Sequence, residues 1–276
     1  MIDTNIDRRS IAGVLLAALT GAAALLAASA LTAGAGAAAS GHGAGPAHGK
    51  PTVVLVHGAF ADGTGWQRVI PLLERDGYNV IAVQNPLTSL AVDVATTKRV
   101  IDAQPGAVVA VGHSYGGAVI TGAAAGNSKV KALVYIAAFA PEAGEPVGAF
   151  LEKYPTALGA ALRPDSAGFL TVERGRFRDL FAQDVPVVEA RVMAAAQKPV
   201  IGDAFGASVP EAAWKTIPSR YMIARSDRAI SPDLQRFYAR RMGARASEID
   251  SSHVPFVSRP AEVARLIDQA ARAAAE

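Results

Sequence analysis

The stretch Val108-Val-Ala-Val-Gly-His-Ser-Tyr-Gly-Gly117 decides the fold of this chain. A short apolar run rich in valine ends in Gly-His-Ser-Tyr-Gly, and a small-residue pattern typical of a helix follows. This order predicts a strand, a sharp turn and a helix, with Ser114 at the apex of the turn. Gly112 and Gly116 let neighbouring backbone pass close to such a turn without meeting a Cβ atom. Ser114 is therefore a candidate nucleophile at the start of a helix, where free N–H groups favour negative charge.

The rest of the chain repeats this alternation of apolar runs and helical patterns. Apolar runs predict strands at 51–56, 78–83, 107–111, 131–138 and 220–224, and a short last strand is predicted at 246–249. The run at 51–56 is continuously apolar, which is typical of a strand buried on both faces. Helical spacing of apolar residues follows most of these runs, the first example being Trp66, Val69, Ile70 and Leu73. The alternation predicts an α/β fold with about six parallel strands and with helices on both faces of the sheet.

Residues from about 140 to 213 interrupt this alternation of strand and helix patterns. The segment is rich in proline and shows no clear buried strand. One helix is predicted within it. Asp184 can cap the start of this helix, Pro186 suits its first turn, and the helix ends near Gln197. An insertion at the carboxyl edge of a parallel sheet is placed to act as a lid. The chain is therefore predicted to form one α/β domain over residues 51–276, with this lid inserted.

The first 50 residues have the order of an export signal. The pair Arg8-Arg9 precedes an uncharged stretch rich in alanine and leucine at 11–33, small-residue sites at 28–35, and a run of glycine and alanine. This order predicts a cleaved signal peptide and a flexible leader over residues 1–50, and the arginine pair points to the twin-arginine route. An uncleaved anchor is the alternative, because the apolar stretch is long enough to span a bilayer. We expect an exported protein, periplasmic or secreted, without stable membrane association after cleavage.

The composition excludes several classes of protein. The chain has 276 residues, no cysteine and a formal net charge of +3. The lack of cysteine excludes a cysteine nucleophile, a thiolate metal site and disulfides. The net charge is too small for a nucleic-acid-binding surface, and the arginine-rich run at 236–245 is predicted to be the solvated face of a helix. The expected partner is a small molecule and not a nucleic acid.

A serine nucleophile needs an adjacent base, and the five histidines leave one strong candidate. Two of them lie in the leader. His57 belongs to the turn after the first strand, and His113 lies inside the tight turn, where packing is its expected role. His253 follows the last strand, at the same edge of the sheet as Ser114, and is the predicted general base.

The base in turn needs an acid that fixes its tautomer. Asp227 directly follows the strand before the one that leads to His253, and it is the preferred candidate. Asp250, three residues before His253, is the alternative, although it could simply cap the loop. The chain order serine, aspartate, histidine is the one expected for this type of fold.

The oxyanion of a tetrahedral intermediate also needs N–H donors. We expect them to be the backbone N–H groups of Tyr115, which follows the nucleophile, and of Ala59, in the loop after the first strand. The side chain of Phe60 is expected to line the substrate pocket. Tyr115 is a further candidate for that lining, whereas Trp66 fits the core stripe of its helix and is expected to pack there.

Four stretches together resemble the α/β-hydrolase superfamily. They are Val53-Val-Leu-Val-His-Gly-Ala-Phe60, Gly112-His-Ser-Tyr-Gly-Gly117, Tyr221-Met-Ile-Ala-Arg-Ser-Asp-Arg-Ala-Ile230 and Ser252-His253. Within that superfamily they are similar to the branch of plant methyl-ester esterases, hydroxynitrile lyases and bacterial pyrethroid-hydrolase-like esterases. The resemblance implies nucleophile Ser114, acid Asp227, base His253 and oxyanion donors Ala59 and Tyr115, the same set that the residues alone favour.

The expected activity is hydrolysis of small carboxylic esters through an acyl-serine intermediate, without metal or cofactor. The alternatives are lactone or amide hydrolysis, C–C or C–CN cleavage, and a ligand-binding member without turnover. The lyases of the branch keep a threonine and a lysine at the positions of Gly58 and Val254. Because this chain lacks both, an apolar wall formed by Val254 and Phe256 is expected beside His253, which suits an ester better than a cyanohydrin.

Overall fold

The computed structural model describes residues 49–274. Nearly all of the predicted signal peptide and leader lies outside the described residues. Within 49–274, none of the helices has both the length and the apolar character needed to cross a membrane.

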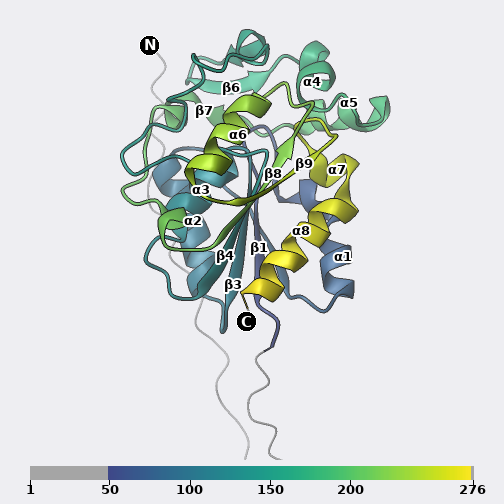
Figure 1. Cartoon of the computed structure of the whole chain (residues 1–276). Coiled ribbons are helices and arrows are strands. Elements are labelled where there is room, and N and C mark those ends of the chain that lie inside the picture. Colours follow the sequence, from purple (N-terminus) through teal and green to yellow (C-terminus); the bar gives the residue numbers. More distant parts are fainter. Residues whose placement is uncertain (1–48, 275–276) are drawn as a thin grey trace, which may run out of the picture. The chain divides into compact units, whose positions relative to one another are not determined.

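Six parallel strands form the central sheet, in the order β2-β1-β3-β4-β8-β9 (Figure 1). Their bounds are β1 (Thr52–Val56), β2 (Val80–Val83), β3 (Val108–His113), β4 (Val130–Ile136), β8 (Ser219–Ala224) and β9 (Arg245–Ile249). The predicted parallel sheet of six strands is confirmed. All residues of the central strands β1 and β3 are buried, because their continuous apolar runs meet helices on both faces.

Helices cover both faces of this sheet. The helices α1 (Ile70–Arg75) and α8 (Pro260–Ala273) lie on one face, and α2 (Leu90–Asp102) and α3 (Tyr115–Ala123) lie on the other (Figure 1). Two further helices follow the last strands of the sheet: α6 (Pro232–Arg241) packs against β8, and the short α7 (Pro255–Ser258) precedes α8. The layers place the carboxyl ends of β1, β3, β8 and β9 at one edge, where the candidate site residues follow them.

The insertion between β4 and β8 has more regular structure than the sequence predicted. It contains a small antiparallel sheet as well as two helices, and Figure 1 shows it beyond the carboxyl edge of the main sheet. Its elements are β5 (Leu162–Pro164), β6 (Phe169–Val172), β7 (Val200–Ile201), α4 (Arg174–Phe181) and α5 (Val187–Ala196). These strands show no apolar run in the sequence because they have at most four residues and are largely half-buried or exposed.

One smaller prediction is wrong, and another holds only in part, since Arg240 and Arg245 of the arginine-rich run are exposed. Asp184 does not cap α5: the residue before that helix is Pro186, and the Asp184 carboxylate accepts a hydrogen bond from Ser252 N at 3.0 Å. Arg241, in the run predicted to be solvated, is half-buried. Its guanidinium donates to Glu145 at 2.6 Å and lies over aromatic rings, because a planar cation can stack on aromatic faces while it keeps its ion pair.

Candidate active site

Ser114 lies at the sharp turn between β3 and α3. Its backbone has φ 54° and ψ −125°, a conformation that non-glycine residues rarely adopt and that costs about 1–3 kcal/mol. Neighbouring backbone leaves no room for side chains around this turn. A Cβ on Gly116 would lie 2.5 Å from Val56 O, and one on Gly58 would lie 2.6 Å from the Cβ of Ser114. The loop after β1 therefore lies directly against the serine, as the predicted strand–turn–helix arrangement requires.

His253 and Asp227 meet at the same edge of the sheet. His253 Nδ1 lies 2.7 Å from Asp227 Oδ2, and both side chains are buried. Asp250, the alternative partner, is exposed, and its carboxylate faces Arg225 at 3.8 Å. The structure thus brings Asp227, and not Asp250, to the imidazole of His253.

Further donors fix the orientation of the Asp227 carboxylate. Oδ1 accepts from the backbone N–H groups of Ala229 and Ile230, at 2.7 and 3.0 Å. Oδ2 accepts from the side chain of Gln235 at 2.7 Å, in addition to its contact with His253. Gln235, a buried polar residue at an inward position of α6, was not among the predicted site residues. The only sequence signal was an amide among the apolar residues of that face.

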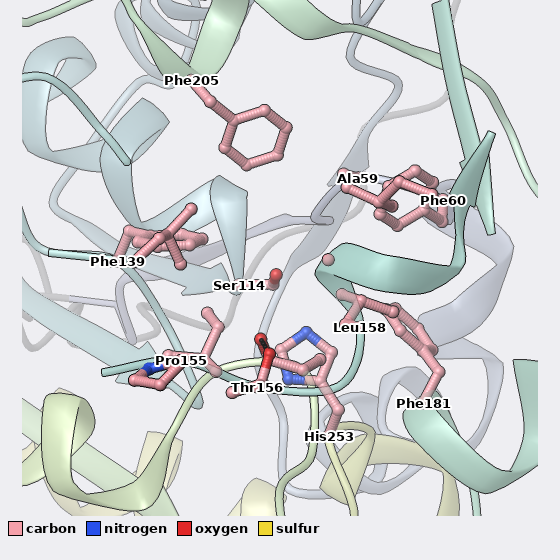
Figure 2. A pocket seen from close by; sticks show the side chains of 15 residues that line it. Ala59, Phe60, Ser114, Phe139, Pro155, Thr156, Leu158, Phe181, Phe205 and His253 are labelled. Carbon is pink, nitrogen blue, oxygen red and sulfur yellow. Dashed lines mark hydrogen bonds between the residues drawn. The ribbon is translucent and has the colours of Figure 1, made fainter. Parts of the chain in front are cut away.

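Ser114 and His253 line one pocket. Its volume is about 190 Å³, and among the described residues that line it none is charged. Figure 2 shows Phe139 and Phe205 on one side of this space and Phe60 and Phe181 on the other. Within the described chain the Ser114 hydroxyl has no hydrogen-bond partner. The contact from that hydroxyl to the histidine, which acyl transfer needs, is often loose in enzymes without substrate.

The two predicted oxyanion donors flank the serine. Ala59 lines the pocket with Ser114, and Tyr115 begins the helix that follows the serine. Among residues 49–274, neither backbone N–H has an intramolecular acceptor, so both can serve a ligand oxygen. The tyrosine ring, in contrast, does not line the pocket. It is buried against α2, and its hydroxyl donates to the carboxylate of Asp93 at 2.8 Å.

Of the other residues considered for the pocket, some line it and others are packed in the core. Phe60 lines the pocket as predicted, whereas Trp66 is buried in the core against Phe256, with ring centroids 4.6 Å apart. The expected wall of Val254 and Phe256 is wrong, because both side chains point into the core and neither lines the pocket. The apolar surface beside His253 comes from the insertion instead: the ring of Phe181 stands edge-on to the imidazole at 4.7 Å.

Two other histidines are packed beneath the site. His57 Nε2 accepts from Asn85 N at 3.0 Å and its Nδ1 donates to Gly58 O at 2.8 Å, so the ring is neutral. His113 donates from Nε2 to the carbonyl of His253 at 2.8 Å, which ties the nucleophile strand to the base loop. Burial lowers the pKa of His57 to about 4, and burial, together with the neighbouring His253, holds the pKa of His113 well below its usual range.

These buried histidines should make the protein less stable in mild acid. The unfolded chain takes up protons near pH 6.5, whereas folded His57 stays neutral until about pH 4, so stability falls as the pH drops between these values. His57 alone should lower the free energy of unfolding by about 2 kcal/mol between pH 7 and pH 5. Urea unfolding at both pH values measures the change. A His57→Gln variant, less stable at pH 7, should lose less on acidification; an equal loss would contradict the assignment.

Within the described part of the chain, no group of three or more histidine, aspartate or glutamate side chains lies close enough together to hold a metal ion. The site residues described above form an arrangement that can perform acyl transfer. A serine on a strained turn, an imidazole oriented by a carboxylate and two backbone N–H groups are the parts that such a reaction requires.

Comparison with known proteins identifies the class. Residues 53–266 match the alpha/beta hydrolase family, and the chain belongs to that family. It is 28% identical to the alpha/beta hydrolase nvfD of Aspergillus novofumigatus over 82% of this chain and 99% of that protein. It is 26% identical to methylesterase 8 of Arabidopsis thaliana over 68% of this chain and 76% of that one. The crystal structure of a pyrethroid hydrolase from Sphingobium faniae shares the fold, with a TM-score of 0.70, 24% identity and coverage of 81% and 98%.

Proposed function

We propose that this hydrolase cleaves small, apolar carboxylic esters through an acyl-serine intermediate. The observation that carries the proposal is the convergence on one pocket of Ser114 and His253, with Asp227 2.7 Å behind the imidazole. Esterases among its relatives, such as methylesterase 8 of Arabidopsis thaliana, support the same class of reaction.

The reaction takes place in two acyl transfers. His253 Nε2 removes the proton of the Ser114 hydroxyl as its oxygen attacks the ester carbonyl carbon. The N–H groups of Ala59 and Tyr115 stabilise the oxyanion, and loss of one such donor costs roughly 10²–10³-fold in rate. The imidazolium, stabilised by Asp227, then gives its proton to the leaving alcohol. Water attacks the acyl-serine with the same base, which releases the carboxylic acid and restores the serine.

The lining of the pocket favours neutral substrates. Its walls are aromatic and aliphatic, and the polar side chains that line it are Ser114, Thr156 and His253. The Thr156 hydroxyl already donates to Ala229 O at 3.2 Å. A charged acyl or alcohol group would lose its hydration here without a counter-ion, which is unfavourable by several kcal/mol. The described lining residues include no lysine or arginine, and this disfavours cyanohydrin cleavage, since the departing cyanide would have no fixed cation beside it other than the imidazolium of His253.

A test of this function needs an ester, a label and a cyanohydrin. Purified protein should hydrolyse p-nitrophenyl acetate and butyrate, and a serine-directed phosphonate should modify Ser114, as located by mass spectrometry of peptides. Mandelonitrile should decay no faster than in buffer. A binding protein without turnover would leave the esters intact, and enzyme-dependent release of benzaldehyde without ester turnover would assign the pocket to a lyase.

A further inference from the structure

One short segment of the insertion contacts the loops of both the candidate acid and the candidate base. This segment, 181–184, connects the end of α4 to α5. Gln183 donates from its side-chain amide to the carbonyl of Ser226, the residue before Asp227. Asp184 accepts from the backbone N–H of Ser252, the residue before His253, at 3.0 Å.

The two loops are also joined to each other at these residues. Ser226 N donates to Ser251 O at 3.1 Å. The segment therefore contacts two loops, those of the acid and of the base, that are already hydrogen-bonded to each other. A third contact of the segment is made by the Phe181 ring, which packs edge-on against the imidazole of His253. Helix α4 braces the segment, because Arg178 donates to Gln183 O at 3.0 Å and to Val185 O at 3.2 Å.

The carboxylate of Asp184 is suited to hold a backbone N–H. Burial alone would raise its pKa, but the hydrogen bond from Ser252 and the nearby hydroxyl groups of Ser251 and Ser258 outweigh that effect and hold the pKa below its usual range. A hydrogen bond from an N–H group to an ionised carboxylate is about twice as strong as one between neutral groups. The base loop therefore has a strong anchor that belongs to the insertion and not to the sheet.

Given the acyl-transfer function proposed above, we propose that Asp184 is a positioning residue for the general base. By holding the N–H of Ser252, it fixes the backbone from which His253 reaches toward Ser114. The segment 181–184 thus orients the acid–base pair, besides closing one side of the pocket. Loss of this anchor lets the imidazole drift from its working position, and a displacement of about 1 Å at a reacting group can lower a rate by roughly 10².

The test compares Asp184→Ala with Asp184→Asn on p-nitrophenyl butyrate, after turnover by the wild-type protein has been established. The alanine variant loses the acceptor, and its kcat should fall about tenfold with KM within twofold of wild type. The asparagine variant keeps an acceptor oxygen for Ser252 N and should recover most of that loss. Asp179→Ala, which removes an exposed carboxylate from α4, is the matched control and should behave as wild type.

The outcomes separate the two proposals. A wild-type protein without ester turnover would overturn the proposed function itself. If the wild type is active and Asp184→Ala keeps kcat within threefold, or if asparagine is as impaired as alanine, the positioning role is wrong. If Asp184→Ala does not fold, Gln183→Ala is measured in its place, because that substitution removes only the contact with Ser226 O. A fall in kcat of threefold or more then supports the anchoring segment, and a smaller one overturns it.

Discussion

Replacing Ser114 with alanine is expected to lower ester hydrolysis by at least about 10⁴-fold while the fold is retained. Removing the nucleophile leaves only the rate that comes from the oxyanion donors and from binding. The fold should survive because the Ser114 hydroxyl has no hydrogen-bond partner among the described residues, and alanine keeps the same backbone conformation. Activity on p-nitrophenyl butyrate, circular dichroism and the melting temperature measure the two effects separately.

The matched control for this variant is Ser166→Ala, at an exposed serine between β5 and β6. It should retain wild-type turnover and remain open to phosphonate labelling at Ser114. The Ser114→Ala variant should take up no label at all. If it kept more than about a hundredth of wild-type activity at unchanged circular dichroism, another residue would be the nucleophile.

The sequence predicted the parts of this molecule that depend on local backbone. Most of the six strands follow from apolar runs, and the turn at Ser114 follows from its two flanking glycines, whose small size the packing demands. Residues at the carboxyl ends of these strands must meet at one edge of the sheet. This rule was enough to place Asp227 and His253 in the same region before their contact was known.

Roles that depend on distant partners could not be predicted. Asp184 has the sequence appearance of a helix cap, and only the fold brings it to Ser252, 68 residues further along the chain. The ring of Tyr115 was a candidate for the pocket, yet its direction depends on Asp93 in the preceding helix. The orientation of such side chains depends on tertiary contacts between segments that are distant in the sequence. A periodic pattern in the sequence does not indicate these contacts.

Replacing Asp227 with asparagine is expected to lower kcat by roughly 10³–10⁴-fold, although the shape of the side chain is unchanged. The reason lies in the donors around the carboxylate. One oxygen accepts from the N–H groups of Ala229 and Ile230, and the other from Gln235 and from His253. Asparagine has one acceptor oxygen for these two positions. The asparagine oxygen is expected to take the position of Oδ1, where two backbone N–H groups donate to it. Its NH₂ group then takes the position of Oδ2 and faces His253 Nδ1.

That NH₂ group forces His253 into the tautomer with its proton on Nε2, and an Nε2 that carries a proton cannot accept one from Ser114. Asp250→Asn is the matched control, because it makes the same chemical change at an exposed carboxylate that faces Arg225 at 3.8 Å. It should stay within about twofold of wild type, since an exposed ion pair is worth little. Steady-state kinetics on both variants at pH 8 decides the assignment. Equal losses, or a larger loss at Asp250, would mean that the contact between Asp227 and His253 holds the loop together without serving the reaction.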